Sequence, residues 1–148
     1  MIGRLIAALG HAGAPQSAPP GDGGRLALAA LMVRLARADH RYTAEEAGMI
    51  DALLATRFGL GPEEAARLRA EAERLEAGAP DTVRFTRAIR ELVPHEARFA
   101  LVEDLWRVVL ADGRRDAEED GLMRLAANLL GVPDRDSAIA RRNAARRG

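Results

Sequence analysis

Apolar residues recur every three or four positions along most of the chain. The repeat begins near Arg25, and no later stretch shows the alternation of apolar and polar residues that is typical of a surface strand. Glycine and proline interrupt the repeat at residues 59–62, 78–80 and 131–133, and these residue types mark the end of one helix and the start of the next. The pattern therefore predicts an all-α fold, a single compact bundle of about seven helices.

The fifth expected helix is the most hydrophobic. Its apolar residues, among them Val102, Leu105 and Val109, cover more than one face, so this helix should lie at the centre of the bundle. Trp106 belongs to the same run and is expected in the core rather than at a binding surface. The expected helices cover residues 25–38, 44–58, 63–76, 83–92, 95–111, 117–130 and 134–139.

The chain divides into three parts. Residues 1–24 comprise a short amphipathic segment, residues 1–9, and a linker rich in proline and glycine. Residues 25–140 form the helical domain, and residues 141–148 form a basic tail that should be frayed.

The apolar run in residues 1–9 is short. It falls below the roughly 20 residues that span a bilayer and is marginal against the roughly 7–15 apolar residues of a signal peptide. We therefore expect no transmembrane segment and a cytoplasmic location. The segment should pack on the domain or on a partner, and peripheral contact with a membrane surface is a further expectation.

Composition supports the helical prediction and removes several function classes. Alanine is the commonest residue, aromatic residues make up only 3%, and all 22 basic residues are arginine. The 22 acidic residues balance them, so the net charge is zero, which argues against nucleic acid as a partner. The absence of cysteine excludes disulfides, thiolate catalysis and zinc fingers.

No catalytic constellation stands out. Ser17 and Ser137 have no histidine near them in the sequence, and no two of His11, His40 and His95 lie four residues apart as zinc-protease ligands do. A chain without lysine cannot carry a Walker A motif. We therefore expect that the protein is not an enzyme, and that His40 is an ordinary exposed side chain.

One motif occurs twice. Residues 38–48 align with residues 111–121 at an offset of 73 positions, and seven of the eleven aligned residues are identical. Hydrophobic helices flank both copies in the same order. Self-similarity of this kind indicates a repeated structural unit. We expect an internal duplication of a helix–turn–helix unit, with the two copies related by an approximate two-fold axis.

Helix capping explains part of the motif. Thr43 and Glu46 have the spacing of a capping box, in which each residue satisfies a backbone N–H of the other. Asp116 and Glu119 form an acidic relative of the same pair. Carboxylates in a first helical turn are also favoured by the helix dipole.

Capping explains Asp39 and Asp112 less well. Each follows the C-terminal end of an expected helix, where the helix dipole disfavours an anion. Each therefore needs a compensating partner, which could be a backbone N–H of the turn, an arginine or a bound cation. Caps alone and carboxylate metal binding are both open on the sequence.

The twin acidic turns resemble those of the TerB (tellurite resistance protein B) family. The resemblance rests on the two acidic turns, on the stretch Leu-Trp-Arg-Val-Val-Leu-Ala-Asp-Gly at residues 105–113, on Phe-Gly-Leu at residues 58–60 and on Leu-Leu-Gly-Val at residues 129–132. It covers approximately residues 25–140. Two positions depart from the family pattern: His40 replaces a turn glycine in the first copy, and Arg115 occupies a usually apolar position in the second.

The resemblance implies a seven-helix domain with an internal two-fold relation and a link to tellurite and other stress responses. It also implies binding of a divalent metal ion, whose identity is open, by paired acidic residues, which in this chain are Asp39, Glu46, Asp112 and Glu119. We therefore expect a non-catalytic stress-response module. The alternative is a protein-interaction adaptor in which the acidic repeats only cap helices. Other proteins are the expected partners in either case.

Overall fold

The computed structural model describes residues 20–38, 40–78, 81–111, 113 and 117–147, without the side chains of residues 20–22, 117–119 and 147. All regular structure in these ranges is helical, as predicted, and no strand occurs among them. The elements are α1 (Pro20–Arg37), α2 (Ala44–Phe58), α3 (Pro62–Gly78), α4 (Val83–Leu92), the short 3-10 helix η2 (His95–Ala97), α5 (Arg98–Val109), α6 (Ala117–Leu129) and α7 (Asp134–Arg147).

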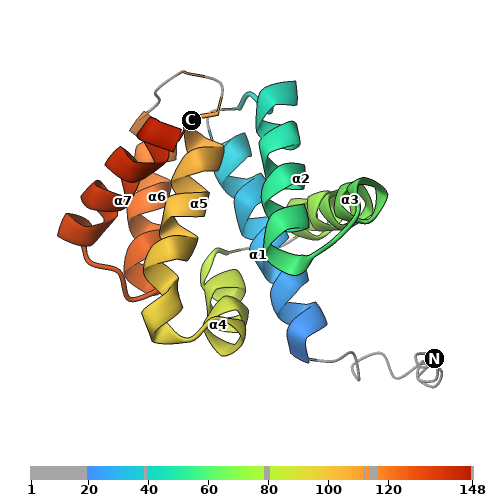
Figure 1. Ribbon diagram of the computed structural model, residues 1–148, viewed down its shortest axis with the longest axis horizontal. Helices are drawn as coiled ribbons and strands as arrows, with labels where there is room; N and C mark the ends of the chain where they lie inside the picture. Colours follow the sequence, from blue (N-terminus) through green and yellow to red (C-terminus); the bar gives the residue numbers. More distant parts are fainter. Residues whose placement is uncertain (1–19, 39, 79–80, 112, 114–116, 148) are drawn as a thin grey trace.

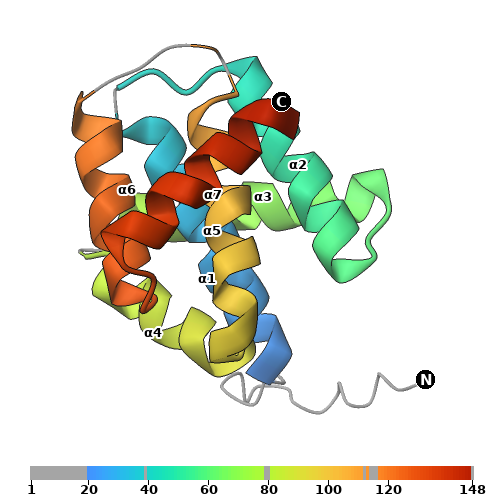
Figure 2. The same ribbon diagram turned by 60° about the vertical axis from the view of Figure 1, so that its left-hand side comes forward.

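Helices α1 and α5 share the centre of the bundle. Helix α1 packs against α2, α3, α4, α5 and α6, while α5 packs against α1, α2, α6 and α7. The fifth helix therefore lies at the centre, as predicted, and α1 shares this position with it. Both helices end, and α2 and α6 begin, at the upper end of the molecule as drawn in Figures 1 and 2.

The core is built from aliphatic side chains of these two helices and their neighbours. Leu28, Leu31, Met32 and Leu35 of α1 are fully buried. Trp106 of α5 is also in the core, as expected, with 7% of its surface exposed. The core side chains of the other helices include Ile50, Leu54, Phe85, Ile89, Leu101, Leu105, Met123 and Leu130.

Helix α1 begins earlier than expected. Its first residue is Pro20, whereas the sequence pattern placed the start near Arg25 and assigned residues 10–24 to a linker. Proline suits a first helical turn because the backbone N–H that it lacks has no partner there. Gly24 is buried against α4, and a Cβ atom at this glycine would lie 2.6 Å from the Cβ of Leu92. The close contact explains why a glycine stands inside the helix.

Helix α7 is longer than expected. It runs to Arg147, so residues 141–147 are not the frayed tail that the basic composition predicted. Ala140 and Ala144 are buried in the core, and Asn143 Nδ2 donates a 2.7 Å hydrogen bond to Glu103 Oε2 on α5. Small alanine side chains allow this close packing, and they give a weak hydrophobic signal in the sequence.

The segment expected as one helix over residues 95–111 is divided. It begins as the 3-10 helix η2 and continues as α5, which ends at Val109. The expectations for residues 1–9 lie outside the described residues. Within the described part of the chain, no helix has the length and apolar character needed to cross a membrane.

Candidate functional site

The first acidic turn joins α1 to α2. Its backbone is held by two hydrogen bonds: Ala38 N–H donates to Leu35 O at 3.3 Å, and His40 N–H donates to Arg37 O at 2.9 Å. His40 has a φ of 65°, a left-handed conformation that is uncommon for any residue except glycine. Its side chain is exposed, as expected.

The second acidic turn follows α5 and has the same backbone arrangement. Ala111 N–H donates to Val108 O at 3.2 Å, Gly113 N–H donates to Leu110 O at 3.1 Å, and Gly113 has a φ of 75°. Each of these residues lies 73 positions after its counterpart in the first turn. The two copies of the motif therefore share a turn conformation at the same end of the bundle. The internal duplication with a two-fold axis stays a prediction.

Glu46 is fully buried at the start of α2. Its backbone N–H donates to Thr43 Oγ1 at 3.1 Å, and Thr43 N–H donates to Glu46 Oε1 at 2.9 Å. These two bonds form the capping box that the spacing predicted. One carboxylate oxygen of Glu46 therefore serves its own helix end.

The structure brings no metal site together among the residues that it describes. Asp39 and Asp112 lie outside them, and Glu119 belongs to α6 but its side chain is not described. Among the described side chains, no group of three or more histidine, aspartate or glutamate residues is placed to hold a metal ion. The metal site of four acidic residues therefore stays a prediction.

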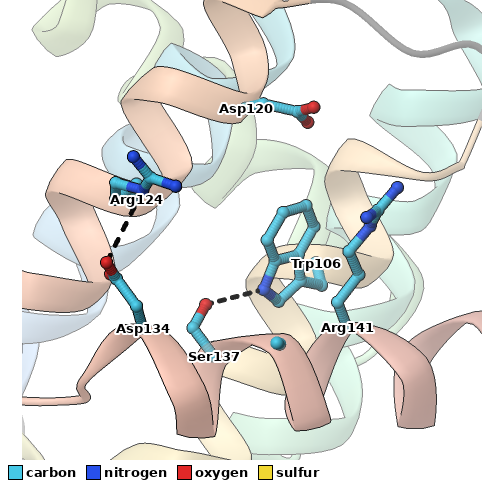
Figure 3. Close-up of a pocket in the computed structure, with 7 residues that line it drawn as sticks. Trp106, Asp120, Arg124, Asp134, Ser137 and Arg141 are labelled. Carbon is cyan, nitrogen blue, oxygen red and sulfur yellow. Dashed lines mark hydrogen bonds and ion pairs between the residues drawn. The ribbon is translucent and has the colours of Figure 1, made fainter.

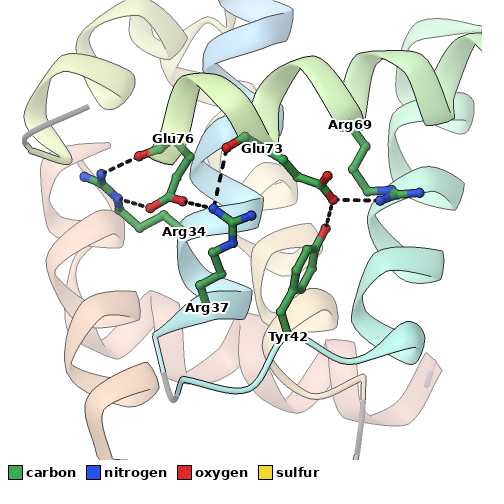
Figure 4. Close-up of polar contacts among 6 residues, drawn as sticks. All are labelled: Arg34, Arg37, Tyr42, Arg69, Glu73 and Glu76. Carbon is green, nitrogen blue, oxygen red and sulfur yellow. Dashed lines mark hydrogen bonds and ion pairs between the residues drawn. The ribbon is translucent and has the colours of Figure 1, made fainter. Parts of the chain in front are cut away.

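A network of ion pairs joins the C-terminal half of α1 to α3 (Figure 4). Arg34 Nε lies 3.1 Å from Glu76 Oε2, and Arg37 Nη1 lies 2.6 Å from Glu76 Oε1. Arg34 also lies over the ring of Phe85, with its guanidinium carbon 5.1 Å from the centroid. A single carboxylate thus pairs with two arginines on the helix before the first acidic turn.

Tyr42, in the turn itself, extends this network. Its hydroxyl donates to Glu73 Oε2 at 2.7 Å, and Arg69 Nη1 lies 2.7 Å from the same oxygen (Figure 4). Burial and the hydrogen bond to Glu73 raise the pKa of Tyr42 to about 12. For Glu73, burial favours the neutral acid, but hydrogen bonds from Tyr42 and Arg69 outweigh it and hold the pKa below its usual value. The hydrogen bond to Asp51 raises the pKa of Arg69.

The sequence pattern did not predict this network. A signal was present, because Arg34 and Arg37 are three residues apart and so are Glu73 and Glu76, a spacing that places both members of each pair on one helix face. Whether the arginine face of one helix meets the glutamate face of the other depends on how α1 packs against α3. The network fixes the entry into the first acidic turn.

A pocket of about 230 Å³ lies where α5, α6 and α7 meet (Figure 3). Trp106 Nε1 donates to Ser137 Oγ at 3.0 Å, and the guanidinium carbon of Arg141 lies 5.3 Å from the centroid of the indole ring. Arg124 and Asp134 form a 3.7 Å ion pair at the rim. The Ser137 hydroxyl oxygen is engaged by the indole N–H, and the contacts of Ser137 and Arg141 with Trp106 fasten α7 to α5.

The comparison with known families gives one result. The family model of the tellurite resistance protein TerB matches residues 25–142, most of the chain. The chain belongs to the TerB family. The matched range runs from Arg25 in α1 to Arg142 in α7, and it contains both acidic turns. No curated protein and no solved structure matches the chain.

Proposed function

We propose that this TerB domain is a non-catalytic, cytoplasmic module that binds a divalent cation and acts in a stress response linked to tellurite. Asp39 and Asp112 would supply carboxylate oxygens, and Glu46 and Glu119 would complete or orient the sites. The observation that carries the proposal is the matched pair of turns. Both turns have the same hydrogen bonds and a positive φ at the same motif position, and both lie at one end of the bundle.

Electrostatics favours a cation at this end. Asp39 comes two residues after the end of α1, and Asp112 comes three residues after the end of α5. The C-terminal ends of α1 and α5, which are the negative ends of their dipoles, lie at one end of the molecule (Figure 1), and a negative helix end raises the energy of a carboxylate that follows it. A divalent cation offsets this repulsion.

The capping box defines the part that Glu46 would play. Since Glu46 Oε1 accepts from Thr43 N–H, this residue fixes the start of α2 relative to the turn. Ca²⁺ takes about six to eight oxygen ligands, so water or backbone carbonyls would have to complete the coordination. The affinity would therefore be modest.

A protein-interaction adaptor is the second candidate. The observation that favours it is again the capping box, because capping gives the Glu46 carboxylate a role at the start of α2 without an ion. In this function the acidic repeats only stabilise helix ends. The linker and residues 1–9 would contact a partner protein or a membrane surface.

Thermal unfolding in the presence of metal ions tests the first candidate against the second. The chelator-treated full chain is titrated with Ca²⁺, Mg²⁺, Mn²⁺ and Zn²⁺, beside the Asp39→Asn/Asp112→Asn variant. An ion at 100 times its Kd adds about 2.7 kcal/mol to the free energy of unfolding, which is a rise of roughly 5–10 °C in Tm for a domain of this size. We expect a saturable rise for one ion that the variant loses.

The matched control is Glu45→Gln/Glu118→Gln. It removes two charges from the same first helical turns but leaves the aspartates in place. It should keep the ion-induced rise in Tm. If no ion at millimolar concentration shifts the Tm of the wild-type chain, the cation proposal fails and the adaptor function stands.

A further inference from the structure

A second pocket of about 230 Å³ lies beside α5, α2 and the last turns of α7. Its wall is apolar apart from one residue, Arg107, in the last turn of α5. No carboxylate of a described side chain lines it. The lining residues are Met49, Arg107, Leu110, Ala111, Ala144 and Ala145.

Arg107 has a donor that the described residues do not satisfy. Its Nε is buried and donates no hydrogen bond within the part of the chain that the structure describes. A buried donor without an acceptor destabilises the folded state, and a donor on a charged group does so more strongly. An arginine in this position is therefore a poor choice for stability alone.

The first half of the chain shows how such an arginine is satisfied. Arg34 lies 73 positions before Arg107, which is the offset of the repeated motif. Its Nε donates to Glu76 Oε2 at 3.1 Å, and Glu76 comes from α3, the helix that packs on α1 (Figure 4). In the second half α7 packs on α5, but α7 lines the pocket with Ala144 and Ala145. Among the described residues, no side chain supplies Arg107 Nε with the acceptor that α3 supplies to Arg34.

We propose that this pocket binds the carboxylate of a small organic acid with a short apolar chain. The carboxylate would accept from the terminal guanidinium nitrogens of Arg107, and the chain would lie against Met49, Leu110 and the alanines. A planar carboxylate fits the fork of a guanidinium, and apolar walls with a single cation suit a monoanion better than a strongly hydrated dianion. The proposal does not depend on a bound cation, although Leu110 and Ala111 also belong to the second acidic turn.

Nuclear magnetic resonance of the full chain, with hexanoate as the probe, tests the proposal. We expect saturable shifts of the backbone amides of Met49, Leu110 and Ala144, with a Kd on the order of 1 mM for a ligand of this size. Arg107→Gln should weaken binding at least about tenfold, because it removes a charge-assisted hydrogen bond. The matched control Arg87→Gln changes an exposed arginine on α4 and should leave binding unchanged.

Two further probes test the charge and the apolar chain of the ligand separately. Hexanol has the apolar chain without the charge, and phosphate has charge without the chain, so neither should saturate the site. Equal binding of phosphate would show a general anion site and overturn the assignment. Absence of saturable hexanoate shifts in the wild-type chain, or shifts that persist in Arg107→Gln, would overturn the proposal as well.

A second variant, which adds a carboxylate instead of removing the arginine, tests the proposal if Arg107→Gln does not fold. Ala145 is exposed at the rim of the pocket, so Ala145→Glu can place a carboxylate beside Arg107 from α7. We expect this variant to have a higher Tm than the wild-type chain and to lose hexanoate binding. A variant that binds hexanoate as tightly as the wild-type chain does would contradict a carboxylate site at Arg107.

Discussion

His40 and Gly113 occupy equivalent positions in the two acidic turns, but they differ in how well they suit the backbone. Both have a positive φ, of 65° and 75°. A residue with a Cβ atom meets steric strain of about 1–2 kcal/mol in this conformation, whereas glycine adopts it freely. The first turn is therefore strained at His40, and the second turn is relaxed at Gly113.

Reciprocal substitutions test this difference. We expect His40→Gly to raise the free energy of unfolding by about 0.5–1 kcal/mol, which is the strain relieved less the entropy that glycine adds to the unfolded chain. Gly113→Ala should lower it by about 1 kcal/mol through backbone strain alone, since nothing lies within 4 Å of a Cβ built there. Urea unfolding measures the change in the free energy of unfolding for both variants. A decrease for His40→Gly would mean that the histidine side chain stabilises the turn by more than its strain.

Among the elements, the contact of α1 with α4 depends on one glycine. A Cβ at Gly24 would lie 2.6 Å from Leu92 Cβ, an atom close to the backbone that cannot move aside easily, whereas a Cβ at Gly23 would meet nothing within 4 Å. The two neighbouring glycines thus provide a test and its control in one helix.

We expect Gly24→Ala to lower the free energy of unfolding by about 1–3 kcal/mol, because the methyl group forces α1 and α4 apart. Gly23→Ala should raise it by up to about 1 kcal/mol through helix propensity. Differential scanning calorimetry of the two variants gives the sign of each change. If both variants are stabilised, the close approach of α1 to Leu92 is not a constraint.

The same contact shows why some elements could be predicted from the sequence and others could not. The start and end of α2 were predicted because Thr43, Glu46 and Gly59 act on their own helix ends, and such signals lie within a few residues. The start of α1 was not predicted, because residues 21–24 have the composition of a linker. Their helical conformation depends on packing against Leu92. Most of α7 was missed for a related reason, since its buried residues are small.

The candidate site, too, could be predicted from the sequence only where its contacts are local. Its local part, the capping box of Glu46, followed from a three-residue spacing. The ion pairs near the first turn did not follow from the sequence, because they require α1 and α3 to meet on particular faces. That no described side chain accepts from Arg107 Nε is visible only when the two halves are compared in three dimensions.

At the scale of the whole molecule, the absence of lysine and cysteine simplifies the response to alkaline pH. The chain has one tyrosine, Tyr42, and all its basic side chains other than three histidines are arginine. Between pH 9 and 12, where lysine, cysteine and tyrosine titrate in most proteins, Tyr42 is the only side chain of this kind present. Alkaline stability therefore reports a single group.

We expect the free energy of unfolding to fall as pH rises from about 10 to about 12. The unfolded tyrosine loses its proton near pH 10, whereas the folded pKa is about 12, so the folded state holds more protons in this range and stability decreases with pH. The loss should be about 1 kcal/mol, after allowance for the solvent screening of a half-buried group. Urea unfolding at a series of pH values measures it, and tyrosinate absorbance gives the pKa of Tyr42 directly.

Tyr42→Phe provides the control, because it removes the titrating group and keeps the ring. The variant should be less stable at pH 8 by about 0.5–1.5 kcal/mol, since Glu73 loses a hydrogen bond, and its stability should stay level between pH 10 and 12. The two curves should therefore converge as pH rises. A variant whose stability falls as steeply as that of the wild-type chain would show that another group titrates, and the link from Tyr42 through Glu73 to α3 would not be what holds the first turn at high pH.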